Sequence, residues 1–233
     1  QFIAMAGFAT NRFDVAKPHL DALVGEGQIS EQLQKMLQDF AQVQREWERE
    51  LVLREQDAQG EPLPRALIKT TKGDIEVELF ENQAPETVGN FIHLVEQGFY
   101  DNLDFHRVLE HFMAQGGCPN GDGLGGPGYM IYNEAQKPDA RKFFRGSLGM
   151  ALAQNPDTAG SQFFITFVPT PQLNNEYTVF GRVLSGLDVL SNLNRIDPEN
   201  KDKNAAPVLP DQILTIEILY KRDHEYKPNK VPQ

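Results

Sequence analysis

The sequence predicts a mainly β domain, an antiparallel barrel or sandwich, with an α-helical extension in front of it. Pro62 and Pro64 divide the chain, because two prolines in close succession end a helix and favour extended backbone. Before this point apolar residues recur every three or four positions, and after it short β-rich runs alternate with glycine and proline. Many short strands with only two helical patterns are typical of an antiparallel barrel or sandwich and not of a parallel α/β sheet.

The helical extension covers residues 1–64. Ser30 is a suitable N-cap for a helix with one apolar stripe, made of Leu33, Met36, Leu37, Phe40, Val43, Trp47 and Leu51. The stripe needs a partner, which would be an earlier helix at about Arg12–Val24, the following domain or a second chain. A helix that only packs against other elements, with no catalytic role, is favoured over a coiled coil, because about three heptads are too few to identify a coiled coil. Residues 11–16 resemble the second half of a tetratricopeptide repeat, but no fixed repeat period is visible.

The β part begins near Ala66, with alternating apolar and polar residues and a first turn at Lys72-Gly73-Asp74. We expect two strands around this turn and further strands at Phe105–Leu109, Phe112–Gln115, Gly146–Ala151, Phe163–Phe167, Thr178–Val183 and about Ile213–Tyr220. A helical period runs from Pro85 to Val95, and a second helix is expected at Leu187–Leu193.

Composition limits the classes of function. The chain has 233 residues, a net charge of -11 and a pI of about 4.9, and an acidic surface repels phosphate backbones, so a nucleic-acid partner is disfavoured. No apolar run approaches the roughly 20 residues that span a bilayer, so no membrane span is expected. The single cysteine, Cys118, excludes an intramolecular disulfide. The compartment stays open, although the start at Gln1 favours a periplasmic or otherwise exported, mature chain over a cytoplasmic one.

Several apparent motifs are better explained as ordinary structure. Gly121, Gly123 and Gly126 have the spacing of a dinucleotide-binding loop, which requires a helix directly after it. Pro127 follows at once, so a plain loop is favoured. The histidines have no metal-ligand spacing and no pair of carboxylates stands out for hydrolysis, so neither a metal nor a cofactor is expected.

Three blocks of residues remain: Phe105–Val108 followed by Phe112–Gly117, then Gly160–Thr166, and then Tyr177–Val183. In this order and spacing they closely resemble the cyclophilin family, over about two thirds of the chain from Ala66 to Lys221. The resemblance implies a closed eight-stranded antiparallel barrel capped by two helices, with a substrate groove on its outer face. It divides the chain into the extension, an isomerase domain at residues 65–223 and a C-terminal tail at residues 224–233. The short domain, without the insertions common in eukaryotic members, is typical of bacterial ones.

The resemblance also implies the site residues. Arg107 matches the catalytic arginine of the family, and His106 matches the histidine beside it. Three residues match the proline pocket: Phe112, Met113 and Phe164. Gln115 and Gln162 match polar groups that hold the backbone of the substrate. Ala151 and Leu173 match further residues of the groove.

Three groove positions depart from the family pattern. Leu152 replaces the usual asparagine, Gln172 falls where many members carry tryptophan, and Tyr177 falls where many carry histidine. The loop from Gln154 to Ala159 also has one extra residue. One wall of the groove therefore differs, which implies weaker binding of cyclosporin-like macrocycles and an altered preference around the proline.

The implied activity is that of a peptidyl-prolyl cis/trans isomerase that assists protein folding, with proline-containing peptides and folding proteins as partners. Rotation about an X-Pro amide breaks no bond, so it needs no nucleophile, metal or cofactor. Arg107 would bind the pyramidal nitrogen of the twisted amide better than either planar form. The alternatives are a proline-peptide binding module with low turnover, and a chaperone or scaffold whose N-terminal helix binds clients or a second copy of the chain.

Overall fold

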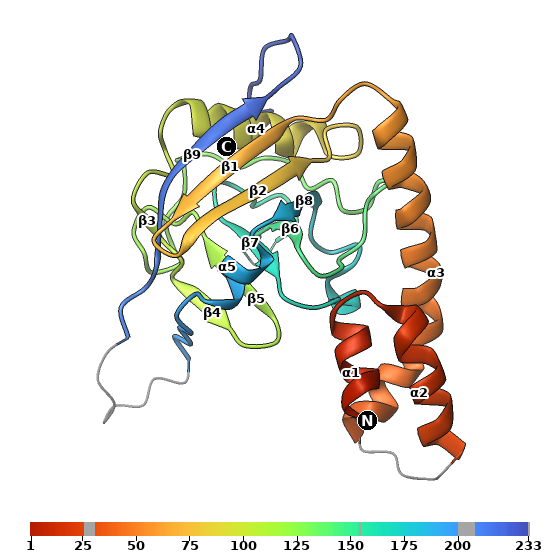
Figure 1. Ribbon diagram of the computed structural model, residues 1–233. Helices are drawn as coiled ribbons and strands as arrows, with labels where there is room; N and C mark the ends of the chain where they lie inside the picture. Colours follow the sequence, from red (N-terminus) through yellow and green to blue (C-terminus); the bar gives the residue numbers. More distant parts are fainter. Residues whose placement is uncertain (26–30, 154, 200–207, 233) are drawn as a thin grey trace.

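The structure is a computed structural model that describes residues 1–25, 31–153, 155–199 and 208–232. A curled β-sheet forms one part of the molecule, and three helices stand beside it (Figure 1). The expected order, a helical segment followed by a mainly β domain, is confirmed. Among the described residues, no helix combines the length and apolar composition that crossing a membrane requires.

The helical part consists of α1 (Phe2–Ala9), α2 (Phe13–Gly25) and α3 (Glu31–Gln59). Helix α2 confirms the expected earlier helix, and α3 confirms the striped helix and continues it to Gln59. The sequence pattern does not predict α1, because its residues FIAMAGFA are nearly all apolar and form no stripe. The proposed cap, Ser30, lies outside the described residues.

The apolar stripe of α3 has partners within the chain. It joins a buried cluster of Ala4, Phe13, Ala16, Leu20, Phe40, Val43 and Phe144, with Leu37 and Trp47 partly buried beside it. Phe144 belongs to the β domain, and its ring centroid lies 4.8 Å from that of Trp47. The stripe therefore packs on both the earlier helices and the β domain. The side chains of Leu33 and Met36 lie outside the described part, and self-association through this helix stays a prediction.

One antiparallel sheet of nine strands has the order β3-β9-β1-β2-β8-β6-β7-β5-β4. The strands are β1 (Arg65–Thr70), β2 (Gly73–Leu79), β3 (Leu103–Asp104), β4 (Arg107–Leu109), β5 (Met113–Gly116), β6 (Ser147–Met150), β7 (Phe163–Thr166), β8 (Val179–Ser185) and β9 (Gln212–Tyr220). All strands expected from the sequence are present, and β3 is additional. Strands β1 and β2 form the predicted hairpin, with Gly73 at a φ of 130°, where a side chain would be strained.

The expected closed eight-stranded barrel is wrong: the sheet is an open, curled half-barrel with β3 and β4 at its edges. The reason is local. Phe105 and His106 carry the chain from β3 into β4 without a turn that would fold the two strands against each other. The edge strand β4 instead exchanges backbone hydrogen bonds with Ile196, whose N and O lie 3.0 and 2.8 Å from their partners on Val108.

Two helices accompany the sheet, as predicted: α4 (Pro85–Glu96) and α5 (Leu187–Ser191). Helix α4 begins at a proline and buries most of its residues against the main core. Phe91 of α4 meets Phe163 of β7 edge to face, with 5.6 Å between the ring centroids. The odd-even alternation of β7 thus directs Phe163 into the core and leaves Phe164 on the outer face.

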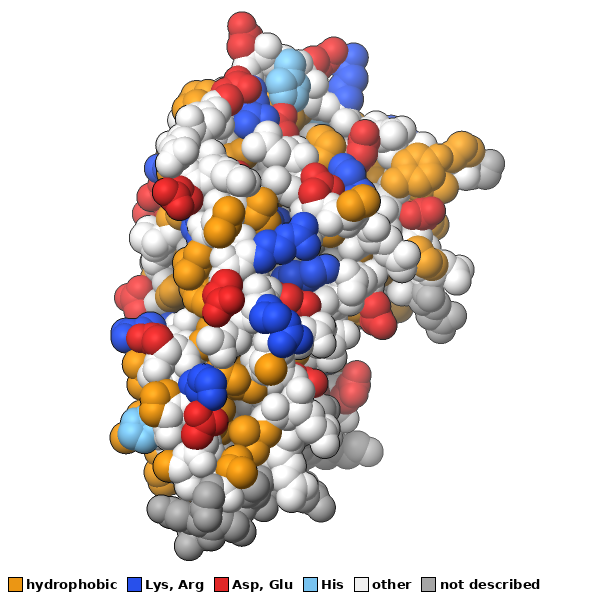
Figure 2. All heavy atoms as spheres, turned by 90° about the vertical axis from the view of Figure 1, so that its right-hand side faces the viewer, with side chains coloured by type: hydrophobic (Ala, Val, Ile, Leu, Met, Phe, Trp, Pro, Cys, Tyr) orange, Lys and Arg blue, Asp and Glu red, His pale blue; other side chains and the backbone are white. Residues whose placement is uncertain are grey.

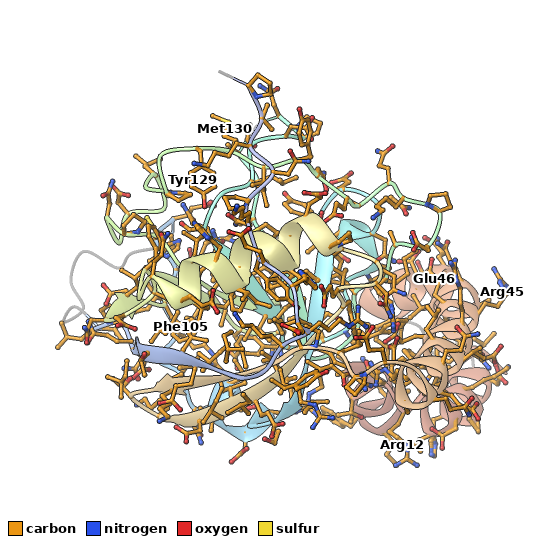
Figure 3. All side chains as sticks on the ribbon, turned by 90° about the horizontal axis from the view of Figure 1, so that it is seen from above. Arg12, Arg45, Glu46, Phe105, Tyr129 and Met130 are labelled. Carbon is orange, nitrogen blue, oxygen red and sulfur yellow. The ribbon has the colours of Figure 1, made fainter. Side chains whose placement is uncertain are left out.

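The C-terminal tail lies against the β domain. Tyr226 is only 4% exposed, and its hydroxyl donates to the Glu81 carboxylate at 3.1 Å. Further along, Lys230 forms a β-bridge with Ile131, and its ammonium group lies 4.2 Å from the centre of the Tyr129 ring. Figure 3 shows Tyr129 on the loops that lie beyond α4. The tail therefore belongs to the packed structure.

Candidate functional site

A groove of about 310 Å³ opens on the outer face of β4, β5 and β7. Arg107 of β4 pairs with Gln115 of β5 in the sheet register, and Gln115 pairs with Phe164 of β7. Their neighbours along the strands, such as Val108 and Ala114, are buried in the main core. Strand alternation therefore places an arginine, an amide and an aromatic ring in one row on the outer surface.

The apolar end of the groove is built around Phe164. Its ring stacks on Phe143 with 5.4 Å between centroids, and Tyr177 meets it edge to face at 5.8 Å. Gly149 lies opposite Phe164 in the register. A Cβ atom at Gly149 would overlap the Phe164 ring and lie 2.6 Å from Cε1 of Phe143, so the glycine makes room for both rings.

The polar end of the groove is held by two glutamines. Gln115 Nε2 donates to Gln162 Oε1 at 3.0 Å. Gln162 Nε2 in turn donates to the carbonyl oxygens of Gly123 and Gly125, at 2.8 and 2.9 Å. The glycine-rich loop is thus fixed beside the groove. The segment between β5 and β6 contains no helix, as the rejection of a dinucleotide-binding loop predicts.

The structure brings together most of the residues proposed from the sequence. The groove is lined by Arg107, Phe112, Met113, Gln115, Ala151, Leu152, Phe164, Leu173 and Tyr177. Gln162 lines an adjoining hollow of about 420 Å³, which shares Gln115, Ala151 and Leu152 with the groove. His106 and Gln172 line neither; His106 lies against Gly123, and Gln172 is exposed.

Two residues that shape the groove are absent from the sequence-based proposal, Phe143 and Gly149. A glycine inside a strand signals close approach by another group, so Gly149 carried a usable signal. Phe143 carried none, because it lies in an irregular segment before β6 and becomes relevant only when that segment folds beneath Phe164. Among the described residues, no three His, Cys, Asp or Glu side chains come together to hold a metal ion.

The two histidines with shifted pKa values are shifted in opposite directions. Burial lowers the pKa of His106, because a partly buried imidazole loses hydration when it is charged. The pKa of His224 is raised by its hydrogen bonds, first to the Glu225 carbonyl and then to the Glu81 carboxylate. In linkage terms, the contribution of His106 to stability is present above its unfolded pKa of about 6.5 and is lost as pH falls. That of His224 is present below this value and is lost as pH rises.

We expect an NMR titration of the histidine rings to show His106 titrating below about pH 6.5 and His224 above it. Because the chain has five histidines, single variants assign the curves: His224→Gln removes the curve of His224, and His106→Gln removes that of His106. A midpoint for His106 above that of a free imidazole would contradict the burial that the structure gives it.

Three comparisons with known proteins point to one family. The family profile described as cyclophilin type peptidyl-prolyl cis-trans isomerase/CLD matches residues 65–218. A peptidyl-prolyl cis-trans isomerase of Helicobacter pylori is 52% identical over 135 residues, which cover 57% of this chain and 81% of the relative. Peptidyl-prolyl cis-trans isomerase B of Bacillus subtilis is 51% identical over 124 residues, covering 53% of this chain and 85% of the relative.

The crystal structure of a cyclophilin type peptidyl-prolyl cis-trans isomerase from Cryptosporidium parvum superposes with a TM-score of 0.59 at 36% sequence identity. The superposition covers 69% of this chain and 99% of that structure. The family profile matches the part of the chain that contains the groove, and the sequence relatives and the structural neighbour are likewise named peptidyl-prolyl cis-trans isomerases. The chain belongs to the cyclophilin-type peptidyl-prolyl cis/trans isomerase family.

Proposed function

We propose that this chain accelerates rotation about X-Pro peptide bonds in the groove, with Arg107 as the catalytic residue. One observation carries the proposal. Arg107 lines a largely apolar groove, and within the described part of the chain its side chain makes no hydrogen bond or ion pair. An arginine side chain offers five N–H donors and stays charged at any working pH. Its donors are therefore available to a group that enters the groove.

The chemistry follows from the electronic structure of the amide. Resonance keeps the planar X-Pro bond from rotating, with a barrier of about 18–20 kcal/mol for ordinary amides. When the bond twists, conjugation is lost and the prolyl nitrogen becomes pyramidal and basic. A donor from Arg107 binds this twisted nitrogen better than the planar one, and only such differential binding raises the rate.

The remaining groove residues hold the substrate during the rotation. Phe112, Met113 and Phe164 offer apolar surface to the proline ring, while Gln115 offers its amide to a neighbouring carbonyl of the peptide. Holding the ring fixed allows the chain on the other side of the amide to turn. The substrates are proline-containing peptides and folding proteins, for which uncatalysed rotation takes tens of seconds or more.

A proline-peptide binding module with low turnover is the second candidate. The wall formed by Leu152 and Tyr177 favours it, because both depart from the family pattern and both line the groove. The available N–H donors of Arg107 favour the isomerase over the binding module.

Turnover by the wild-type chain separates the two. We expect cis-to-trans relaxation of a short Ala-Pro peptide, which takes tens of seconds or more unaided, to become faster in proportion to the concentration of the protein. Heat-denatured protein is the control for buffer effects. Saturable binding of the peptide without acceleration would reject the enzyme and support the binding module.

A further inference from the structure

We propose that Glu46 of α3 is a positioning residue for the proline groove. Through Asn174, it holds Leu173, Tyr177 and Phe143 where the substrate meets them. The inference rests on the proposed function, and it extends that function to the helical part of the chain. Glu46 lies outside the residues that match the family profile, 65–218.

Glu46 contacts the β domain directly. It lies half-buried on the side of α3 that faces the sheet, whereas its neighbour Arg45 is exposed at the outer edge of the helices (Figure 3). Asn174 Nδ2 donates a hydrogen bond to Glu46 Oε2 at 3.0 Å. A carboxylate acceptor makes this bond stronger than one between neutral groups.

The other end of the same amide reaches the floor of the groove. The backbone N–H of Phe143 donates to Asn174 Oδ1 at 2.9 Å. Phe143 carries the ring on which Phe164 stacks. The Asn174 side chain is thus a link between α3 and the residue beneath the proline pocket, with both of its polar atoms in use.

The backbone of Asn174 continues into the wall of the groove. It directly follows the short helix η1 (Pro171–Leu173), whose last residue lines the groove. Tyr177, on the same wall, donates its backbone N–H to the Leu173 carbonyl at 3.2 Å. A displacement of Asn174 would therefore move Leu173 and Tyr177 together.

A second set of contacts keeps α3 itself in a fixed place. Arg141 of the β domain has a fully buried side chain; its Nη1 donates to Glu50 at 3.1 Å and its Nη2 to Asp57. Its guanidinium lies 4.2 Å from the centre of the Phe80 ring, and Phe80 packs in one cluster with Phe143. Glu46 is therefore held on a helix that cannot shift freely relative to the groove.

The outer surface of α3 has a different character. The face of the molecule that includes α3 shows side chains of both charges intermixed (Figure 2). Glu48 is exposed there, and within the described part of the chain its carboxylate accepts a hydrogen bond only from Gln44 of the same helix, at 3.3 Å. Glu46 is thus linked to the groove through Asn174, whereas Glu48, two positions further along the helix, is exposed on its outer surface.

We expect Glu46→Ala to raise KM for an Ala-Pro peptide about three- to tenfold, the range that loss of one such hydrogen bond allows, with kcat nearly unchanged. Leu173 and Tyr177 would contact planar and twisted substrate alike, so their displacement weakens uniform binding. Glu48→Ala, with the same change of charge on the same helix, is expected to keep the wild-type KM. Glu46→Gln keeps an acceptor oxygen for Asn174 without the charge that strengthens the bond, and it is expected to bring KM most of the way back to the wild-type value.

A second pair of variants tests the link through Asn174. Asn174→Asp places a carboxylate against Glu46 and is expected to raise KM at least as much as Glu46→Ala does. Adding Glu46→Gln to Asn174→Asp supplies a donor for the new carboxylate and is expected to recover most of the loss.

The outcomes separate this inference from the proposed function. If the wild-type chain does not turn over, the proposed function fails before Glu46 is tested. If the wild type turns over and Glu46→Ala keeps its KM, the positioning role is rejected while the isomerase stands. A lower melting temperature with unchanged KM would likewise reject it, since it would leave Glu46 a purely structural residue. If Glu46→Gln resembles Glu46→Ala, the hydrogen bond to Asn174 is not the cause.

Discussion

Replacing Arg107 with alanine is expected to lower kcat/KM for an X-Pro peptide about 10²- to 10³-fold, the usual loss when one donor aimed at the transition state is removed. The loss should lie mainly in kcat, because Arg107 interacts with the prolyl nitrogen only when the amide is twisted. The side chain makes no hydrogen bond or ion pair with the described residues, so its removal breaks neither kind of interaction. Relaxation of the peptide measured at several concentrations gives kcat and KM separately.

Two variants serve as controls for Arg107. Arg107→Lys keeps the charge but loses the planar set of donors, and we expect only partial recovery. Arg65→Ala removes an arginine of β1 that is about half exposed and whose ion pairs with described residues, at 3.6 and 3.8 Å, are long, and it should leave the rate unchanged. Wild-type turnover by Arg107→Ala would show that another group stabilises the twisted amide.

Replacing Arg141 with methionine is expected to lower the free energy of unfolding by about 3–5 kcal/mol. The variant leaves the nearly buried carboxylate of Asp57 without its partner, and a buried unpaired charge is costly. Glu50 loses the same partner but keeps Arg54, whose Nε lies 2.8 Å from Glu50 Oε1. The variant also removes the guanidinium from the face of Phe80. Urea denaturation followed by circular dichroism measures the change, provided that the m-value stays constant.

The cause of that loss can be isolated. The double variant Arg141→Met, Asp57→Asn removes the carboxylate that lost its partner and keeps the ion pair between Glu50 and Arg54, and we expect it to be more stable than Arg141→Met alone. Arg45→Met makes the same replacement at an exposed position of α3 and should have little effect. If Arg141→Met is as stable as the wild type, the buried ion pairs do not hold α3 to the β domain.

Much of the fold could be predicted because its signals are local. The prolines at 62 and 64, the alternation around Gly73 and the proline at the start of α4 each act on a few neighbouring residues. Closure of the sheet depends instead on whether two edge strands meet in space. The short connection through Phe105 and His106 keeps the edge strands β3 and β4 from pairing, and the hydrophobic periodicity of the sequence does not predict this.

The site shows the same division. Arg107, Gln115 and Phe164 could be placed on one surface because strand alternation determines which way each side chain points. The residues that support this row could not be predicted in the same way. Phe143 contacts Phe164 from an irregular segment, and Glu46 contacts Asn174, which lies 128 positions away in the chain. Contacts between distant segments depend on packing, which a single sequence does not reveal.

The adjacent residues Phe143 and Phe144 link two cores. Both are 1% exposed, yet Phe143 belongs to the cluster beneath the groove and Phe144 to the cluster of the helices. The two consecutive side chains thus enter different cores, and we expect that neither core can loosen without disturbing the peptide unit that joins them. Although the chain divides near residue 62, we therefore expect the helices and the sheet to unfold as one cooperative unit, with no boundary in stability at the boundary seen in the sequence.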